Sequence, residues 1–597
     1  MCGIFGLYSK SSSISQATEE KVSEHFFQAL HHRGPDSNGL FISSDRKSLL
    51  GHLRLSIVDV ESGIQPMKSD ISDTIVFNGE IYNHNELRAS HDYNFSNHSD
   101  TEVILSGYKV SGEKSFNDLN GMYAFAIHSE RDNSLTLAVD PLGIKSLYLY
   151  EDDELIIFSS ELTALAQYIH AMDPELLEVD DSATYGFLQQ GMFLEQTTPF
   201  KNIRKLKDGS WIRLSSEKSQ GSIVYNSTFS EKDSLKDVVE SSVERQLHAD
   251  VDVCLFLSGG IDSSLVASIV SKTKKIKAFC LAFDEGDIDE SSQAKLVAED
   301  LGIDLEIVKI DPENLESLFE EALLSLDEPI SDFATIPLLA LSRKASDSYK
   351  VCLLGDGGDE LFYGYTHHKY WNHKLLSEKL LPKLVFKSGL YSNLVRFFES
   401  SKSNFSKKVA TFLKLAYPDG ISYGPFTHYD NYLKDNLYTQ QSLSSVSQLH
   451  GFELRNFLSR KLLQKSDRIT MAASMEGRVP LLDLELYNFS RMFYNPENCI
   501  EKGAGKTPLR ELLSDYISNE VYKNKKQGFR VPLSSWCSSD FGSKVRKHLL
   551  SCQFISKFIS KESLSNLFKE FDSGNESHSV RIFTLYSYSV FMNNIIK

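Results

Sequence analysis

Cysteine and proline are scarce in this sequence, with 7 cysteines and 15 prolines among 597 residues. The cysteines are odd in number and irregularly spaced, and they form no Cys-x-x-Cys pair, so no zinc site of the usual spacing is predicted. Cys254, Cys280 and Cys352 fall within apolar runs and are interpreted as inert core thiols. This usage favours a reducing compartment, and we expect the protein in the cytoplasm.

Long uncharged apolar runs are also lacking, and the first residues do not show a charged segment followed by an apolar one. We therefore expect neither a transmembrane span nor a secretory signal. Positive charge is in deficit, because 63 Lys and Arg face 81 Asp and Glu and give a net charge of −18. An acidic chain is a poor match for a phosphate backbone, so nucleic acid is not expected as the main partner.

The length indicates more than one domain. Segment 215–222 is polar and rich in small residues, which predicts a loop or short linker. Helical spacing of apolar residues follows over 231–248. We therefore place the boundary between 215 and 232, with one domain over 1–215 and a second over 232–597.

The clearest chemical signal lies in 253–264. An apolar run over 253–257 predicts a buried strand, Ser258 to Gly260 a tight turn, and 262–270 a helix. A strand, a glycine turn and a helix N-terminus together form an anion site, because free N–H groups and the helix dipole converge there. Asp262 cannot be a phosphate ligand, but it suits Mg²⁺ that bridges it to phosphates. An inert packing turn would need neither this aspartate nor the serines around it.

Strands and helices alternate beyond this turn, with strands expected over 276–283, 305–310 and 349–354 and helices over 291–301 and 336–346. This alternation predicts a doubly wound parallel sheet, an α/β fold whose ligands lie at the carboxyl ends of the strands. A second glycine-rich turn, 355–360, falls at such an end. Two acidic turns side by side favour a cation between them, so we pair Asp359 with Asp262 as magnesium ligands. The alternative for 355–360 is a simple helix start.

The N-terminus offers a second candidate site at Cys2. Removal of Met1 would leave one residue with a thiol and an α-amine, and the amine is basic enough to take the thiol proton near neutral pH. Alternating runs over 49–57, 74–77, 121–128 and 135–139 predict antiparallel sheets around it.

Six patches follow Cys2 in order: 32–36, 52–57, 65–66, 77–83, 99–102 and 140–143. Together they resemble the class II glutamine amidotransferase domain. The resemblance implies an N-terminal-nucleophile αββα sandwich in which Cys2 attacks glutamine. It also implies that Asn78 and the Gly79 N–H form the oxyanion hole. The glutamine-binding residues that it implies are Arg54 for the carboxylate, with Glu80 and Asp100 (and Asn78) around the remaining atoms.

Three histidines in these patches, His31, His32 and His52, are interpreted as structural because the terminal amine already supplies the base. Asp140 is interpreted as a turn residue before Pro141 and not as a catalyst.

The turn 258–264 resembles the pyrophosphatase loop of ATP-dependent adenylating amidotransferases; it lacks the Gly-Lys-Ser/Thr end of a Walker loop. With 355–360, 463–472, 476–483, 505–510 and 526–532, the chain resembles glutamine-dependent asparagine synthetases over nearly its whole length. This resemblance implies that Lys506 stabilises developing charge. The ATP-binding residues that it implies are Leu257, Ser258, Gly259, Gly260, Asp262, Ser263, Ser264, Phe283, Leu354 and Gly355.

Two features leave alternatives open. Many relatives have serine at the position of Leu354, so the acceptor carboxylate is not fixed. Four charged residues are either an ion-pair network that shapes the pocket or substrate contacts: Asp467, Arg468, Glu476 and Arg478.

The resulting hypothesis is a two-site enzyme that hydrolyses glutamine and amidates aspartate with ATP and Mg²⁺. The alternatives are amidation of another carboxylate such as a uronic acid, a non-catalytic binding protein, and a plain amidohydrolase with an appended domain. The oligomeric state stays open, with a homodimer as one alternative.

Overall fold

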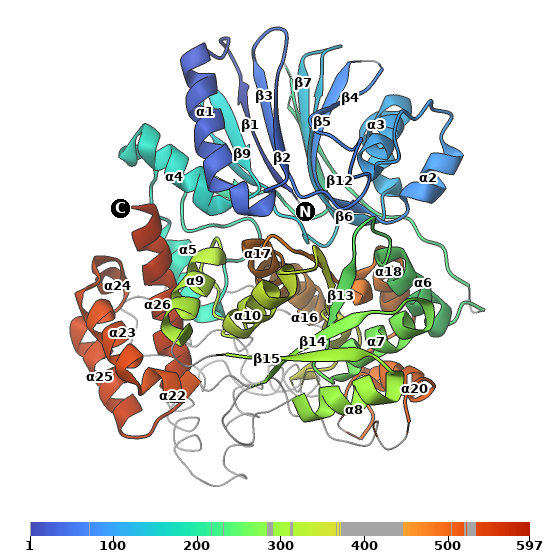
Figure 1. Cartoon of the computed structure of the whole chain (residues 1–597). Coiled ribbons are helices and arrows are strands. Elements are labelled where there is room, and N and C mark those ends of the chain that lie inside the picture. Colours follow the sequence, from blue (N-terminus) through green and yellow to red (C-terminus); the bar gives the residue numbers. More distant parts are fainter. Residues whose placement is uncertain are drawn as a thin grey trace.

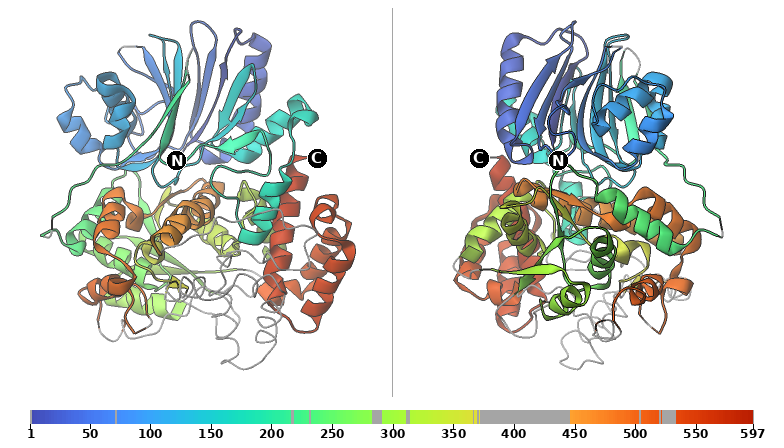
Figure 2. Two further views of the ribbon diagram at one scale, coloured as in Figure 1. Left: turned by 180° about the vertical axis from the view of Figure 1, so that it is seen from behind. Right: turned by 45° about the vertical axis from the view of Figure 1, so that its right-hand side comes forward.

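The computed structural model describes residues 2–70, 72–215, 218–230, 232–282, 291–310, 314–365, 367–368, 371, 446–502, 504–518, 521 and 533–596. The chain forms an antiparallel sandwich stacked on a part built around a parallel sheet, and the N-terminus lies at the junction (Figure 1). Two further views show the same stacking (Figure 2). Among the described helices, none combines the length and the apolar content that crossing a membrane requires.

The sandwich consists of two six-stranded sheets, ordered β10-β8-β9-β1-β3-β2 and β12-β11-β7-β6-β5-β4. Their strands are β1 (Gly3–Ser9), β2 (Ser37–Ile42), β3 (Ser48–Arg54), β4 (Met67–Lys68), β5 (Asp73–Ile81), β6 (Gly121–Ser129), β7 (Ser134–Val139), β8 (Tyr148–Glu151), β9 (Leu155–Ser159), β10 (Ile203–Lys205), β11 (Ser210–Leu214) and β12 (Ser219–Ser222). Every pairing is antiparallel, for example Asn78 opposite Ala124 between β5 and β6.

Helices cover both outer faces of the sandwich, which gives the αββα order that was predicted. The helices α1 (Gln16–Ala29) and α4 (Leu162–Met172) lie on one side, and α2 (His84–Ser90) and α3 (Asp100–Ser111) on the other (Figure 1). Side chains such as Ile4, Leu50, Val76 and Phe158 are buried in a shared apolar cluster. The burial of these apolar faces is the main force that holds the two sheets together.

The predicted loop over 215–222 is wrong at its end, because Ser219–Ser222 forms β12 and pairs with β11. Its residues are small, polar and mostly exposed, so no apolar alternation marks the strand. Backbone pairing at a sheet edge does not need such a pattern.

The second part contains a five-stranded, all-parallel sheet with the order β15-β14-β13-β16-β17. Its strands are β13 (Val253–Phe256), β14 (Lys277–Ala282), β15 (Asp304–Lys309), β16 (Val351–Leu353) and β17 (Glu476–Arg478). The helices α6 (Leu235–Gln246), α7 (Ile261–Thr273), α8 (Ser291–Leu301), α9 (Leu315–Ser325) and α10 (Thr335–Ser346) accompany it. This confirms the doubly wound α/β fold, and the strand order reverses between β13 and β16, where such sheets bind ligands.

Helices make up most of the remaining described chain. They are α5 (Asp181–Gln190), α11 (Gly358–Leu361), α16 (Val446–Glu453), α17 (Gln464–Ala472), α18 (Leu484–Phe493), α19 (Pro496–Cys499), α20 (Thr507–Ser514), α22 (Leu533–Cys537), α23 (Asp540–Ser551), α24 (Gln553–Phe558), α25 (Lys561–Asp572) and α26 (His578–Ile595). One apolar cluster includes Phe5 and Phe26 of the sandwich together with Phe583 of α26. The two parts therefore share a core.

Candidate active sites

Cys2 lies at the start of β1, beside the middle of β5. Its backbone N–H donates to Asn78 Oδ1 at 3.1 Å, and both residues are buried. Asn78 Nδ2 is buried without a hydrogen-bond partner in the described part of the chain. A buried amide donor left over at this position is available to a ligand atom beside Cys2.

Gly79 follows Asn78 with a φ of +155°. A Cβ at this position would lie 2.0 Å from the Met122 carbonyl oxygen of the neighbouring strand. Only glycine fits, because the backbone conformation and the space both exclude a side chain.

Burial raises the pKa of the Cys2 thiol, while the N-terminal amine, a hydrogen bond from the Leu55 backbone and the charge of Arg54 act in the opposite direction. The buried imidazole of His52 is no base: burial lowers its pKa to about 3, and its Nε2 lies 3.2 Å from the Phe77 carbonyl oxygen. His52 is therefore a neutral structural residue at pH 7, as predicted.

Two buried carboxylates, Glu80 and Asp100, lie close together at the end of β5, where Asp100 Oδ2 accepts a hydrogen bond from the Ile81 N–H. Burial raises the pKa of Asp100 to about 6 and that of Glu80 well above its usual value, and each also feels neighbouring carboxylates. Such an excess of negative charge attracts a cation. Arg54 donates to the carbonyl oxygens of Val58, Asp59 and Val60, which fixes its guanidinium at the end of β3.

A buried ion-pair network joins this site to α17. Arg33 donates from Nε to the Cys2 carbonyl oxygen at 3.1 Å and from Nη2 to Asp467 Oδ2 at 3.1 Å. Lys145 Nζ lies 2.9 Å from Asp467 Oδ1, and Arg468 Nη1 lies 2.7 Å from Oδ2. Burial alone would raise the pKa of Asp467, but these three cations hold it far below the usual range.

A second connection runs through β17. Arg478 pairs with Glu476 at 2.6 Å and with Glu80 of the sandwich at 3.3 Å. Its Nη1 also donates to the carbonyl oxygens of Gln246, the last residue of α6, and of His248, two residues further on. Asp467, Arg468, Glu476 and Arg478 thus form buried ion pairs, as the first of their two interpretations expected.

The predicted nucleotide turn lies at the switch point of the parallel sheet. Gly259 has a φ of +71°, and α7 begins after Gly260. The hydroxyl groups of Ser258 and Ser263 lie 3.0 Å apart, and the Gly260 N–H lies 3.3 Å from Ser258 Oγ. Ser264 is almost fully buried. This is the predicted strand, glycine turn and helix N-terminus.

The second turn packs directly against the first. A Cβ at Gly355 would lie 2.8 Å from the Ser263 backbone nitrogen, and one at Gly358 would lie 2.1 Å from Asp262 Oδ1. Leu354 is buried, and its N–H donates to the Arg478 carbonyl oxygen at 2.8 Å. Leu257 is buried and donates to the Phe279 carbonyl oxygen. Phe283 lies outside the described residues.

Lys506 connects the two acidic turns. It pairs with Asp262, and its Nζ lies 2.7 Å from Asp359 Oδ1. Burial opposes its charge, but the two carboxylates keep the pKa of Lys506 above its usual value. Two carboxylates held within reach of one cation at a phosphate-type turn are the donor set that Mg²⁺ prefers, so the residues present fit that ion.

The sequence did not indicate which residues form ion pairs between the sandwich and the second part of the chain. Arg33 and Lys145 stand within or beside patches that were singled out, but no local pattern indicates which acid each one meets. Glu476–Arg478 was not expected as a strand, because three residues with two charges do not alternate. Segments 372–445 and 522–532, which include the whole of the motif 526–532, lie outside the described residues.

Comparison with known proteins matches each part of the chain to a family. A family model described as asparagine synthase matches residues 234–593, and one for a glutamine amidotransferase domain matches residues 1–226. Glutamine-hydrolyzing asparagine synthetase 1 of Bacillus subtilis (strain 168) is 29% identical, covering 99% of this chain and 96% of that protein.

Two other relatives show the range of names among similar proteins. A putative glutamine-hydrolyzing asparagine synthetase of Mycobacterium bovis is 27% identical over 98% of this chain and 96% of its own length. Amidase chry2 of Gibberella zeae is 26% identical over 95% of this chain and 93% of its own length. Since the first family model spans more than half of the sequence, the chain belongs to the asparagine synthase family and is an ATP-dependent, glutamine-using carbon–nitrogen ligase.

Proposed function

We propose that the protein is a glutamine-dependent asparagine synthetase. The observation that carries the proposal is the juxtaposition of Cys2 with the unpartnered Asn78 amide at one site, while Lys506 joins two acidic turns at the other. A nucleophile beside an oxyanion donor fits glutamine hydrolysis, and a phosphate turn with paired carboxylates fits ATP chemistry. The proposed division between the two activities is 1–215 and 232–597.

At the first site, the Cys2 α-amine exposed by removal of Met1 takes the thiol proton, and Sγ attacks the amide carbon of glutamine. The oxyanion accepts hydrogen bonds from Asn78 Nδ2 and the Gly79 N–H. The C–N bond then breaks, ammonia leaves with the proton, and water hydrolyses the thioester to glutamate.

The charges of the pocket match free glutamine. Its α-carboxylate pairs with Arg54, and its α-ammonium lies beside Glu80 and Asp100. The bound ammonium adds positive charge beside these buried carboxylates, so it lowers the pKa of both acids towards their ordinary values.

At the second site, a β-carboxylate oxygen of aspartate attacks the α-phosphorus of ATP, and pyrophosphate leaves. Ammonia then attacks the β-carbonyl carbon, AMP leaves and asparagine forms. The N–H groups of the turn 258–264 hold phosphate oxygens, and Lys506 stabilises the charge of the leaving group. Mg²⁺, held by Asp262 and Asp359, would neutralise phosphate charge when bound.

A second candidate is the same chemistry on another carboxylate, such as a uronic acid. It is supported by Leu354, which places no hydroxyl beside the nucleotide turn, and by relatives that are named amidases. A non-catalytic protein would need neither Cys2 nor the Lys506 arrangement, and a plain amidohydrolase would not need the second site.

The deciding experiment measures pyrophosphate release from ATP and Mg²⁺ with ammonia as nitrogen source, with and without L-aspartate. We expect release that depends on aspartate, with asparagine and AMP as products. Active protein that responds to a uronic acid but not to aspartate would refute asparagine synthesis and leave the two-site mechanism intact.

Two variants separate the sites. Cys2→Ala should abolish glutamine-dependent synthesis and retain ammonia-dependent synthesis, whereas Asp262→Asn should abolish pyrophosphate release and retain basal glutaminase activity. Loss of both activities in a folded Cys2→Ala protein would contradict the two-site model.

A further inference from the structure

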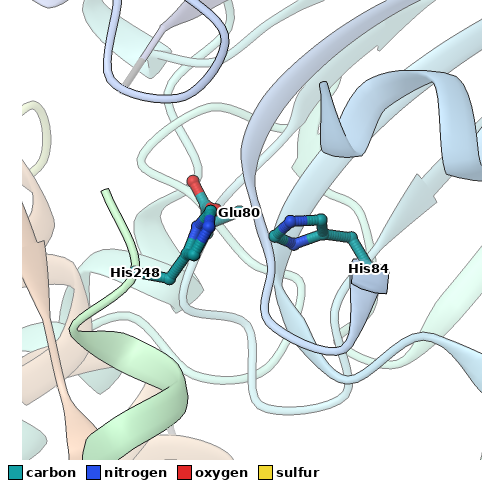
Figure 3. A group of neighbouring side chains, drawn as sticks. All are labelled: Glu80, His84 and His248. Atoms are coloured by element: carbon teal, nitrogen blue, oxygen red, sulfur yellow. The ribbon is translucent and has the colours of Figure 1, made fainter. Parts of the chain in front are cut away.

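Three metal-ligating side chains converge at the boundary between the two parts of the molecule. Glu80 is the residue before the last of β5, His84 begins α2, and His248 follows α6 (Figure 3). Each offers one ligand atom, and these atoms all lie within 4.8 Å of one another. A tetrahedral zinc ion holds its ligand atoms about 3.4 Å apart, so small side-chain rotations would close the set around one ion.

The tautomer of His84 is already fixed for metal binding. Its Nδ1 lies 2.8 Å from the Ile81 carbonyl oxygen, to which it donates, and its ring is 2% exposed. The lone pair is therefore on Nε2, the arrangement usual for a metal-bound histidine whose other nitrogen donates to a carbonyl. Burial lowers the pKa of His84 and of His248, so both imidazoles are neutral near pH 7.

The surrounding charges favour a cation. Glu80 lies near the carboxylates of Asp100 and Glu476, and the positive charges that oppose them are the guanidinium of Arg478 and the N-terminal amine. Three carboxylates against these two cations leave a buried excess of negative charge, which is the condition under which a bound cation offsets the cost of burial.

A second cluster of two histidines and one glutamate provides a contrast, because its members hydrogen-bond to one another. There, His367 and His368 each lie 2.7 Å from an oxygen of Glu453 through Nε2, so hydrogen bonds within the cluster occupy those atoms. In the first cluster, no hydrogen bond joins His84 or His248 to Glu80 in the part of the chain that the structure describes. The two imidazoles instead lie with ring centroids 4.9 Å apart.

We propose that Glu80, His84 and His248 form an inhibitory site for one divalent transition-metal ion of the zinc type. Two imidazoles and one carboxylate are a ligand set that zinc accepts with water as the fourth ligand. The ion withdraws Glu80 from the glutamine α-ammonium, so metal and glutamine compete. This consequence rests on the proposed function, whereas metal binding itself does not.

Binding is tested by calorimetric titration of Zn²⁺ into Cys2→Ala protein, which removes the reactive thiol as an alternative ligand. We expect one tight site per chain. We make His248→Asn and His84→Asn, each in the Cys2→Ala background. Loss of a residue that only hydrogen-bonds to a metal ligand lowers metal affinity by roughly 10- to 100-fold. Loss of a ligand itself should lower the Zn²⁺ affinity by more than that. His98→Asn, which removes an exposed imidazole elsewhere in the sandwich, serves as the matched control. Equal affinity in His248→Asn and His98→Asn, or no tight site in any protein, overturns the proposal.

Competition is tested by glutaminase assays of protein with Cys2 intact, without ATP. Zn²⁺ should raise the KM for glutamine and leave kcat unchanged, and His248→Asn should resist this inhibition while it keeps basal activity. Inhibition of both proteins to the same extent overturns competition at this site. Absence of glutaminase activity without Zn²⁺ would refute the proposed function instead, and the calorimetric result would still decide the metal site.

Discussion

The guanidinium of Arg33 lies 3.1 Å from the Asp467 carboxylate and 3.1 Å from the carbonyl oxygen of Cys2. One side chain thus contacts the backbone of the proposed nucleophile and the helix α17, which packs against β17 and α10. The two residues are 434 positions apart in the chain. A buried ion pair therefore joins the surroundings of Cys2 to the second part of the chain.

Replacement of Asp467 by Asn should strongly destabilise the protein, because it leaves three buried cations with a neutral partner. Loss of one member of a buried pair costs about 3–5 kcal/mol. Urea unfolding followed by tryptophan fluorescence measures the loss. Asp70→Asn, which breaks the exposed pair with Lys109, is the control and should cost about 1 kcal/mol or less. Similar midpoints for the two variants would show that the network does not hold the parts together.

Replacement of Asn78 by Ala should lower the glutaminase kcat by about 10²- to 10³-fold, since it removes a buried donor from the position of the oxyanion. Ammonia-dependent synthesis should be unchanged. Asn83→Ala, five residues later, is the control because its side chain bonds to the Asp118 carbonyl oxygen and the Asn120 N–H. A loss in Asn83→Ala as large as in Asn78→Ala would argue for a structural role of both.

Replacement of Lys506 by Ala should lower ammonia-dependent synthesis by about 10²-fold or more, because the cation between Asp262 and Asp359 is lost at the phosphate site. Glutaminase activity without ATP should persist. Lys506→Arg tests whether charge alone suffices. Lys502→Ala, which removes an exposed lysine four residues earlier, is expected to behave as wild type. Full synthesis by a folded Lys506→Ala protein would remove this residue from the chemistry.

His52 should make the wild-type protein sensitive to mild acid. Its pKa is about 3 in the folded protein against 6.5 in the unfolded chain, so the unfolded state binds the additional proton as the pH falls below 6.5. Stability is therefore lost between pH 7 and pH 5 by roughly 2 kcal/mol relative to His52→Gln. Urea midpoints of both proteins at several pH values measure the difference, which should be nearly constant above pH 7. Parallel curves down to pH 5 would show that His52 is not held neutral by burial.

Much of the fold follows from local patterns. The apolar run before Ser258 predicts β13 because a strand buried on both faces has no polar positions, and the glycines that follow leave a helix N-terminus open. The run over 121–128 predicts β6 because its residues alternate with the two-residue period of a strand. The strands β12 and β17 could not be predicted, because polar or charged residues form them and neighbouring strands hold them through backbone pairing.

The sequence by itself indicated which residues belong to the two candidate sites. Asn78–Gly79 and the serine–glycine turn with Asp262 are short local motifs, and Cys2 joined the first of them only through the resemblance to a known family. Their catalytic roles stay predictions that the variants above test. Only the tertiary structure decided which buried charges meet, such as Arg33 with Asp467 and Glu80 with Arg478. A charge buried by folding must find an opposite partner to offset lost hydration, and the chain path, not the local sequence, determines which partner is within reach.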